Sequence, residues 1–292
     1  MKYRKQMATR IYMEMSIEKP VDNYFITLTY DDEHIPNVAG RQCFNKDHLI
    51  RFLDSLRHKL RPRGLSLRYF ATCEYGEEGY RPHYHLLLLL YGEGKPFLRS
   101  PRSRVFEFNR DYVEPLWPYG FSYDGRVSIR SVMYCTCYAL KDDEALERDW
   151  SGFEQGKPFR LFSLRPGLGL TSNCVSWWLE YTYNDGDYRY GLRIGKGLKH
   201  PISSSIPVAV KRRFKNDNPG FYEDYKSQNQ RNREDSLSFL ASNVERYGPS
   251  KVYGNSYPGD RIGYFSRVPD DEVIAFRKAL RELSKRERNP LK

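Results

Sequence analysis

The sequence predicts an α+β fold in which an antiparallel β-sheet packs against helices, followed by a C-terminal extension of mixed structure. Residues 24–30 are mostly aromatic and β-branched, which is typical of a strand. Residues 46–60 carry apolar side chains at helical spacing. Residues 65–74 and 83–91 are predicted as two more strands, and the turn residues between them indicate a hairpin. The strands of a hairpin pair in antiparallel fashion, and this sets the type of sheet.

Local signals support the first strand and the helix. The alternation in residues 24–30 places Phe25, Thr27 and Thr29 on one face of the strand. Asn45 is a typical N-cap residue, so the helix is expected to start at Lys46. The apolar side of this helix would consist of Leu49, Phe52, Leu53, Leu56 and Leu60.

Length, charge and cysteine content limit the possible functions. The chain has 292 residues, a net charge of +11 and 24 tyrosines. Lys and Arg side chains among aromatic rings suit single-stranded nucleic acid, which has negative phosphates and stackable bases, better than a membrane. The five cysteines include no Cys-x-x-Cys pair, and no apolar run approaches the roughly 20 residues of a membrane helix. We therefore expect reduced thiols, a cytoplasmic location and no membrane partner.

Two histidines lie at alternate positions where the strand of residues 83–91 begins. His83 and His85 therefore point to the same face of the sheet. The predicted hairpin brings Glu74 beside them, and two imidazoles with one carboxylate form a plausible ligand set for a divalent ion. The alternative is a pair of structural core histidines with Glu74 in solvent.

A second candidate site lies in residues 132–141, which we expect to form a helix capped by Ser131. A strand pair or bulged strand over residues 121–129 would precede it. Tyr134 and Tyr138 are four residues apart and Lys141 follows three later, so all three share one side of a helix. An amphipathic helix with half-buried tyrosines is the alternative.

These residue types suit attack by a tyrosine on a phosphodiester. The pKa of a free phenol is about 10, so tyrosine is a weak nucleophile unless its target is activated. A divalent ion on the phosphate supplies this activation, and a lysine adds positive charge. The resulting phosphotyrosyl link keeps the bond energy of the phosphodiester, so the strand can be rejoined, and two tyrosines could act in turn.

The chain resembles the HUH endonucleases, whose His-hydrophobic-His motif corresponds here to His83-Tyr84-His85. Within them it is similar to the rolling-circle replication initiators of the Microviridae, especially the gokushovirus type. Five blocks occur in the order of that family: residues 25–30, 73–77 and 81–85, the pattern Tyr134-x-x-x-Tyr138-x-x-Lys141, and residues 162–169. The resemblance covers roughly residues 20–170, and the order of the blocks is more specific than any single block.

The resemblance also implies roles for individual residues. The implied roles are Mg²⁺ or Mn²⁺ ligand for His83, His85 and Glu74, nucleophile for Tyr134 and Tyr138, and assisting cation for Lys141. The pattern of the family places a lysine directly before the second tyrosine, where this chain has Cys137. Any role of that lysine is therefore in doubt for this chain.

Basic residues downstream are candidates for contacts with DNA. Residues 187–215 contain a single acid and many cations, with glycines and tyrosines between them, as is typical of a segment that contacts a nucleic-acid strand. The candidate DNA-binding residues are Arg81, Arg165, Arg189, Arg193, Lys196, Lys199, Lys211, Arg212 and Arg213. Arg165 lies in a glycine-rich turn before a helix, which can hold a phosphate or serve only as a structural turn. A solvated basic loop is the alternative for the whole segment.

Three regions follow from these patterns. We expect a catalytic core in residues 1–145, a family-specific and basic segment in residues 146–215, and a polar extension in residues 216–292 that ends in an amphipathic helix from about residue 270. The sequence contains no Walker phosphate loop and no helicase signature, so a host helicase and a host polymerase are expected partners.

The leading hypothesis is a metal-dependent enzyme that nicks and rejoins single-stranded origin DNA by tyrosine transesterification. It would start and end rolling-circle replication of a small single-stranded DNA phage in the cytoplasm of its bacterial host. Three alternatives stay open: a transposase or relaxase of the same superfamily, a non-catalytic module that binds single-stranded nucleic acid, and a hydrolase whose metal activates water.

Overall fold

The computed structural model describes residues 2–76, 79–97, 107–138, 153–184, 192–194, 202–204, 206–220 and 222–227, and residues 230, 231, 234 and 238. The chain divides into two compact units, Met1–Cys174 and Val175–Lys292. The two units are described one at a time below. No helix among these residues is both long and apolar enough to cross a membrane.

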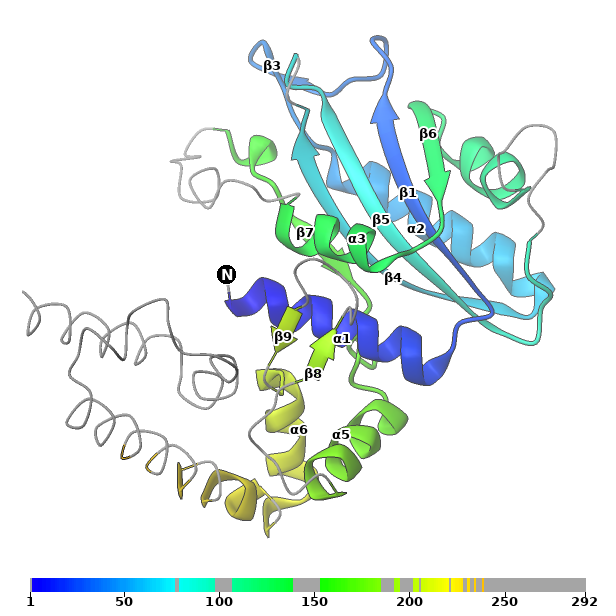
Figure 1. Ribbon diagram of the computed structural model, residues 1–292. Coiled ribbons are helices and arrows are strands. Elements are labelled where there is room, and N and C mark those ends of the chain that lie inside the picture. Colours follow the sequence, from blue (N-terminus) through cyan, green and yellow to red (C-terminus); the bar gives the residue numbers. More distant parts are fainter. Residues whose placement is uncertain are drawn as a thin grey trace, which may run out of the picture. The chain divides into compact units, whose positions relative to one another are not determined.

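The first unit is built around a five-stranded antiparallel sheet with the strand order β6-β1-β5-β4-β7 (Figure 1). Its strands are β1 (Asp22–Tyr30), β4 (Leu65–Tyr75), β5 (Pro82–Gly92), β6 (Gly120–Gly125) and β7 (Arg160–Phe162). A short hairpin, β2 (Asn37–Val38) with β3 (Arg41–Gln42), lies outside this sheet. The hairpin predicted around residue 78 is the β4–β5 pair, and the predicted α+β fold is confirmed.

Helices cover both faces of this sheet (Figure 1). The α-helices of this unit are α1 (Lys2–Glu18), α2 (Lys46–Leu60) and α3 (Ile129–Met133). The 3₁₀ turns are η1 (Arg61–Arg63), η3 (Glu114–Leu116) and η5 (Glu154–Gly156), and the π-helical turns are η2 (Asn109–Val113) and η4 (Tyr134–Tyr138).

Helix α2 begins and packs as the sequence predicts. The Asn45 side chain accepts hydrogen bonds from the backbone N–H groups of Asp47 and His48, so it is the N-cap. The predicted apolar side of the helix is buried against the sheet. This packing leaves the opposite face of the sheet for α1, α3 and the candidate site.

The leucine run of β5 fixes which face the histidines occupy. Leu86, Leu88 and Leu90 are buried in the cluster that includes α2, whereas Leu87 is buried in the cluster that includes α1 and α3. A shift of the strand by one residue would exchange these two sets of side chains. Because both faces are apolar at these positions, burial alone favours neither register, and the polar residues at the start of β5 have to decide between them.

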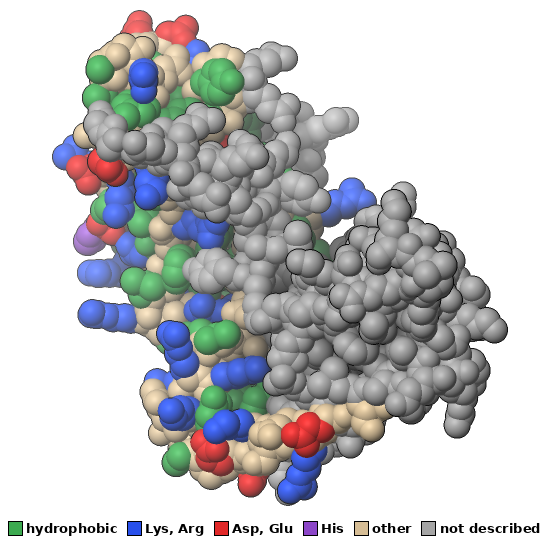
Figure 2. All heavy atoms as spheres, turned by 90° about the vertical axis from the view of Figure 1, so that its left-hand side faces the viewer, with side chains coloured by type: hydrophobic (Ala, Val, Ile, Leu, Met, Phe, Trp, Pro, Cys, Tyr) green, Lys and Arg blue, Asp and Glu red, His purple; other side chains and the backbone are tan. Residues whose placement is uncertain are grey.

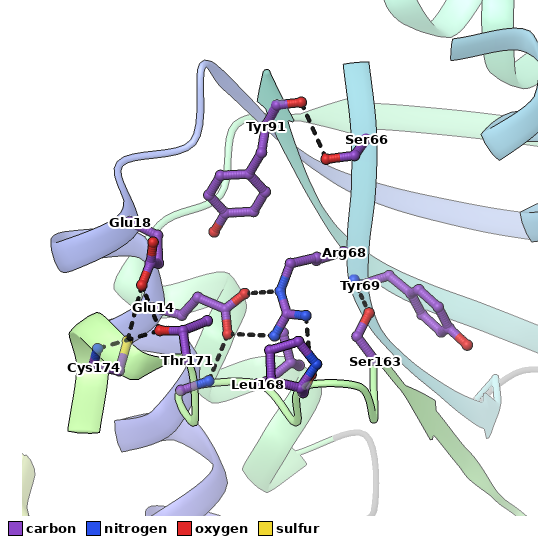
Figure 3. Close-up of polar contacts among 12 residues, drawn as sticks. Glu14, Glu18, Ser66, Arg68, Tyr69, Tyr91, Ser163, Leu168, Thr171 and Cys174 are labelled. Atoms are coloured by element: carbon purple, nitrogen blue, oxygen red, sulfur yellow. Dashed lines mark hydrogen bonds and ion pairs between the residues drawn. The ribbon is translucent and has the colours of Figure 1, made fainter. Parts of the chain in front are cut away.

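A buried ion pair attaches α1 to the sheet (Figure 3). The Glu14 carboxylate is fully buried and accepts hydrogen bonds from Nε and Nη2 of Arg68 on β4, the latter at 2.9 Å. It also accepts the backbone N–H of Gly169. Nε of Arg10 donates to the carbonyl of Leu168 at 2.7 Å.

These contacts also explain the segment of residues 162–169. The main chain at Gly169 passes so close to α1 that a Cβ atom there would lie 2.5 Å from the carbonyl oxygen of Arg10, and its φ of +64° favours glycine. Its N–H group already serves Glu14. The described contacts of this segment are therefore those of a structural turn, and Arg165 is exposed on it.

The second unit contains four described elements. They are most of α5 (Ser172–Asn184), the paired strands β8 (Leu192–Ile194) and β9 (Ile202–Ser204), and α6 (Val208–Asp217). Trp178, Val210 and Phe214 are fully buried here. The helix predicted from about residue 270 lies outside the described residues, and the division into three regions remains a prediction.

Candidate active site

The central strands of the sheet place five polar side chains on one face. In the register of β1 and β5, Thr29 pairs with His83 and Thr27 pairs with His85. In the register of β4 and β5, Glu74 pairs with His83. Side chains directly opposite each other in an antiparallel pair share a face of the sheet. All five therefore lie on the face opposite to α2.

Each histidine is held by a threonine from β1. Oγ1 of Thr29 lies 2.8 Å from Nδ1 of His83, and Oγ1 of Thr27 lies 3.0 Å from Nδ1 of His85. Hydrogen bonds of this kind fix the orientation and the tautomer of an imidazole. Because Nδ1 of each ring is engaged, Nε2 is the nitrogen left for a further partner.

Glu74 joins the hairpin to the tyrosine helix. Nε2 of His85 lies 2.9 Å from Oε1 of Glu74, and the hydroxyl of Tyr134 donates to the same oxygen. The Tyr134 ring also packs edge-on against His85, with 5.0 Å between ring centroids, and against Phe25 at 6.2 Å. The two candidate sites therefore meet at one carboxylate.

The local electrostatics favour a charged carboxylate beside a neutral imidazole. Burial raises the pKa of Glu74, but hydrogen bonds from His85 and Tyr134 outweigh it, so the pKa of this carboxyl lies below its usual value. Burial lowers the pKa of His83, and the neighbouring His85 lowers it further. Ionised carboxylates and neutral imidazoles are the forms that bind metal ions.

The donor types at this face suit a divalent cation. Two neighbouring ligands of an octahedral ion at about 2.1 Å lie about 3 Å apart, close to the 2.9 Å between His85 and Glu74. No group of three or more His, Cys, Asp or Glu side chains among the described residues has a geometry that could hold an ion as it stands. His85 and Glu74 are in contact, and His83 supplies the third donor of the predicted set on the same face.

The tyrosine helix starts earlier than the sequence indicates. The prediction of Ser131 as N-cap is wrong, because Ser128 is the N-cap and its Oγ accepts the N–H of Ser131 at 3.1 Å. Oγ of Ser131 accepts the N–H of Ser128 in return, at 2.8 Å, which completes a capping box. The expected strand pair over residues 121–129 is instead the single strand β6 followed by the start of α3.

Apolar side chains on the helix set the direction of Tyr134. Val132 and Cys135 are buried in one cluster with Phe70 and Leu87 of the sheet. This anchors the helix over the sheet beside the histidines, so the Tyr134 hydroxyl reaches Glu74. The backbone of Tyr138 belongs to the π-helical turn η4, whereas its side chain and Lys141 lie outside what the structure describes.

Comparison with known proteins gives this arrangement a family. Residues 23–143 match the family described as "Replication-associated protein ORF2". This part of the chain belongs to the ORF2 family of replication-associated proteins. The match contains every residue predicted as a metal ligand, nucleophile or assisting cation.

Two curated relatives are similar over the same order of length. The "Replication-associated protein ORF2" of Spiroplasma virus 4 is 32% identical over 126 residues, which are 42% of this chain and 39% of that protein. The "Replication-associated protein VP4" of Bdellovibrio phage phiMH2K is 33% identical over 146 residues, 47% of this chain and 44% of that protein. The chain thus spans less than half the length of these relatives. No solved structure matches it.

Within the match to the ORF2 family, the candidate DNA-binding residue Arg81 is engaged with the protein. Its Nη1 donates to the carbonyl of Tyr30 at 2.8 Å, and its Nη2 pairs with Asp32. Arg81 therefore fastens the end of β1 to the start of the histidine strand. Contact with DNA through this side chain remains a prediction.

The other basic candidates lie beyond the match to the ORF2 family. On α6, Nζ of Lys211 lies 5.2 Å above the ring of Tyr225, Arg213 pairs with Asp217 at 2.7 Å, and Arg212 is exposed. Outside the described residues lie Arg189, Lys196 and Lys199, and the side chain of Arg193. Figure 2 shows that Lys and Arg side chains are prominent on the described part of the face it presents.

Sequence reasoning did not assign functional roles to four residues on the site's face. Thr27 and Thr29 were placed on one face of β1 without a partner, although the alternation of β1 against the histidine strand carried the signal. Phe121 and Tyr123 on β6 were hidden by the expected strand pair. Only the register of β6 against β1 shows which face they occupy.

Proposed function

We propose that this protein nicks and rejoins single-stranded DNA, with Tyr134 as a nucleophile that becomes covalently linked to a DNA phosphate. The observation that carries this proposal is the shared carboxylate oxygen: Oε1 of Glu74 accepts the Tyr134 hydroxyl and lies 2.9 Å from Nε2 of His85. A phenol, an imidazole and a carboxylate that meet on a partly open sheet face suit phosphoryl transfer.

His83, His85 and Glu74 would hold a divalent ion, Mg²⁺ or Mn²⁺. When bound, such an ion offsets the negative charge on the phosphate and orients the phosphate for in-line attack. The support for this assignment is the threonine contact at Nδ1 of both imidazoles, which leaves Nε2 as the ligand atom.

The residues of the chain position the nucleophile. Glu74 has a lowered pKa and is therefore a weak base, so it orients the phenol more than it removes the proton. In the nicking step Oη of Tyr134 forms a bond to phosphorus, the bond from phosphorus to the 3′ oxygen breaks, and that oxygen takes up a proton. The reverse reaction with a 3′ hydroxyl rejoins the strand. Tyr138 would act as the second nucleophile and Lys141 as an assisting cation.

The biological role follows from the relatives. Both are replication-associated proteins of a virus or phage. A nickase that keeps the bond energy in a phosphotyrosyl link can start and end rolling-circle replication of a small single-stranded DNA phage. A host helicase and a host polymerase would supply unwinding and synthesis in the bacterial cytoplasm.

A covalent-adduct assay tests this proposal. The protein is incubated with single-stranded DNA that carries the phage origin and with Mn²⁺, then boiled in detergent and separated by size. We expect a protein–DNA adduct whose peptide map places the link at Tyr134 or Tyr138, and no adduct when EDTA is present.

Other outcomes favour the alternatives. Cleavage that leaves a free 5′ phosphate without an adduct would indicate attack by water. Binding without cleavage under any divalent ion would indicate a non-catalytic nucleic-acid module. Adducts formed only with transposon or plasmid transfer origins would indicate a transposase or relaxase.

A further inference from the structure

The outer strand β6 exposes two large aromatic side chains. Phe121 is 60% exposed and Tyr123 is 65% exposed. Both rings therefore expose apolar surface to water without burying it in the fold. β6 is an edge strand of the sheet, and its partner is β1.

The strand register places both rings on the face of the candidate active site. Phe121 pairs with Thr29 and Tyr123 pairs with Thr27, the two threonines that hold the histidines. Side chains paired in this way share a face. The rings thus continue two rows of side chains that cross the sheet: Phe121, Thr29, His83 and Glu74 in one row, and Tyr123, Thr27, His85, Thr72 and Arg160 in the other.

We propose that Phe121 and Tyr123 form a stacking surface for two bases of the DNA strand next to the phosphate attacked by Tyr134. This inference rests on the proposed function and adds the residues that bind the flanking nucleotides. We call Phe121 and Tyr123 the edge aromatic pair.

The spacing of the edge aromatic pair suits single-stranded DNA. Residues two apart in a strand are about 7 Å apart, so each ring can take one base of an extended strand. The Cα of Phe121 lies two strand spacings, or about 10 Å, from that of His83 across β1. Bases next to the reacting phosphate can therefore reach the rings without leaving the sheet.

The charges on this face also suit a polyanion. Glu74 is the only acidic residue in the two rows, and it is engaged by His85 and Tyr134. Arg130, which is exposed, lies on α3 between the edge aromatic pair and the nucleophile. Aromatic rings beside cations on an open sheet are a common way to bind single strands, because every base has a face that can stack.

The rival occupant is a protein segment that pairs with the free edge of β6. Such a segment would bind mainly through backbone hydrogen bonds and would need no nucleic-acid base. The two occupants therefore differ in whether removing the bases from a bound strand matters.

The test measures DNA binding in EDTA, so it needs no cleavage. Full-length wild type and the double variant Phe121→Ala, Tyr123→Ala are titrated with a fluorescent oligothymidylate and with an abasic oligonucleotide of equal length, at several salt concentrations. We expect each ring lost to weaken oligothymidylate binding by about 5- to 100-fold. We expect the salt dependence to be unchanged, because no charge is removed.

Two further variants keep the result interpretable. Tyr123→Phe retains the ring and should restore the affinity that Tyr123→Ala loses. Leu164→Ala removes another exposed apolar side chain, 70% exposed, away from β6, and should bind like wild type. Thermal unfolding of each variant shows whether the fold is kept.

Each remaining outcome has a defined meaning. Equal binding of wild type and the double variant would overturn the stacking surface while leaving the nicking proposal intact. An equal loss of affinity for the abasic strand would also overturn it, since stacking needs bases. A wild type that binds no single-stranded DNA would instead reject the proposed function itself.

Discussion

Oγ1 of Thr29 on β1 lies 2.8 Å from Nδ1 of His83 on β5, so one strand of the sheet sets the orientation of a candidate ligand on the next. Thr27 and His85 repeat the relationship one step further along the same two strands. The candidate metal site is therefore built by pairs of residues across the sheet.

Removing this hydroxyl should weaken the site without unfolding the protein. In Thr29→Val the side-chain shape is kept but the hydrogen bond to His83 is lost. Loss of such an outer partner typically lowers metal affinity or activity by about 10- to 100-fold. We expect the Mn²⁺ concentration for half-maximal cleavage to rise by this order. Thr29→Ser keeps the hydroxyl and should stay near wild type, and equal behaviour of the two variants would contradict the assignment.

Tyr134 should be separable into a chemical and a binding role. Tyr134→Phe removes the hydroxyl that donates to Glu74 but keeps the ring against His85 and Phe25. We expect adducts at this position to vanish while the affinity for single-stranded DNA in EDTA stays within a few-fold. His83→Ala should likewise abolish cleavage and retain most DNA affinity. A His83→Ala protein that nicks at the wild-type rate would remove the metal site from the mechanism.

His48 on α2 makes stability depend on pH. Burial lowers the pKa of His48, with a further contribution from Arg51, and its ring stacks on Tyr119 at 3.8 Å. The unfolded chain therefore binds a proton at a higher pH than the fold does. Stability is fully present above the unfolded pKa of about 6.5 and is lost as the pH falls below that value toward the folded pKa.

Thermal unfolding between neutral and mildly acidic pH measures this effect. We expect the melting temperature of wild type to fall with pH across this window. His48→Phe keeps an aromatic ring but cannot titrate, so its melting temperature should fall less steeply. Parallel curves for the two proteins would show that His48 does not contribute.

The ion pair between Glu14 and Arg68 should dominate the attachment of α1. Glu14→Ala leaves the largely buried Arg68 without its partner and Gly169 N–H without its acceptor. Breaking a buried pair from one side costs about 3–5 kcal/mol. Urea unfolding monitored by circular dichroism would measure this loss.

A matched surface pair serves as the control. Arg57 and Asp54 on α2 are 2.7 Å apart, with side chains 41% and 55% exposed. Arg57→Ala should change the free energy of unfolding by less than about 1 kcal/mol, because exposed pairs contribute little. A Glu14→Ala protein as stable as this control would show that α1 is held by apolar contacts alone.

Much of the fold follows from the sequence because the signals are local. The N-cap at Asn45 and the apolar side of α2 depend on residues within a few turns of each other. The shared face of His83 and His85 follows from the alternation of a strand, wherever that strand lies. The predicted start of the tyrosine helix was wrong because Ser128 and Ser131 are both good caps, and the capping box uses the two together.

The sequence by itself determined which residue types belong to the site and which of them share a face. Only the tertiary structure decided that Tyr134 meets His85 at Glu74, that β1 supplies the threonines, and that β6 turns Phe121 and Tyr123 to the same face. The physical reason is that these contacts join segments far apart in the chain. Their geometry comes from strand register and from the burial of Val132 and Cys135 against the sheet, which no local pattern encodes.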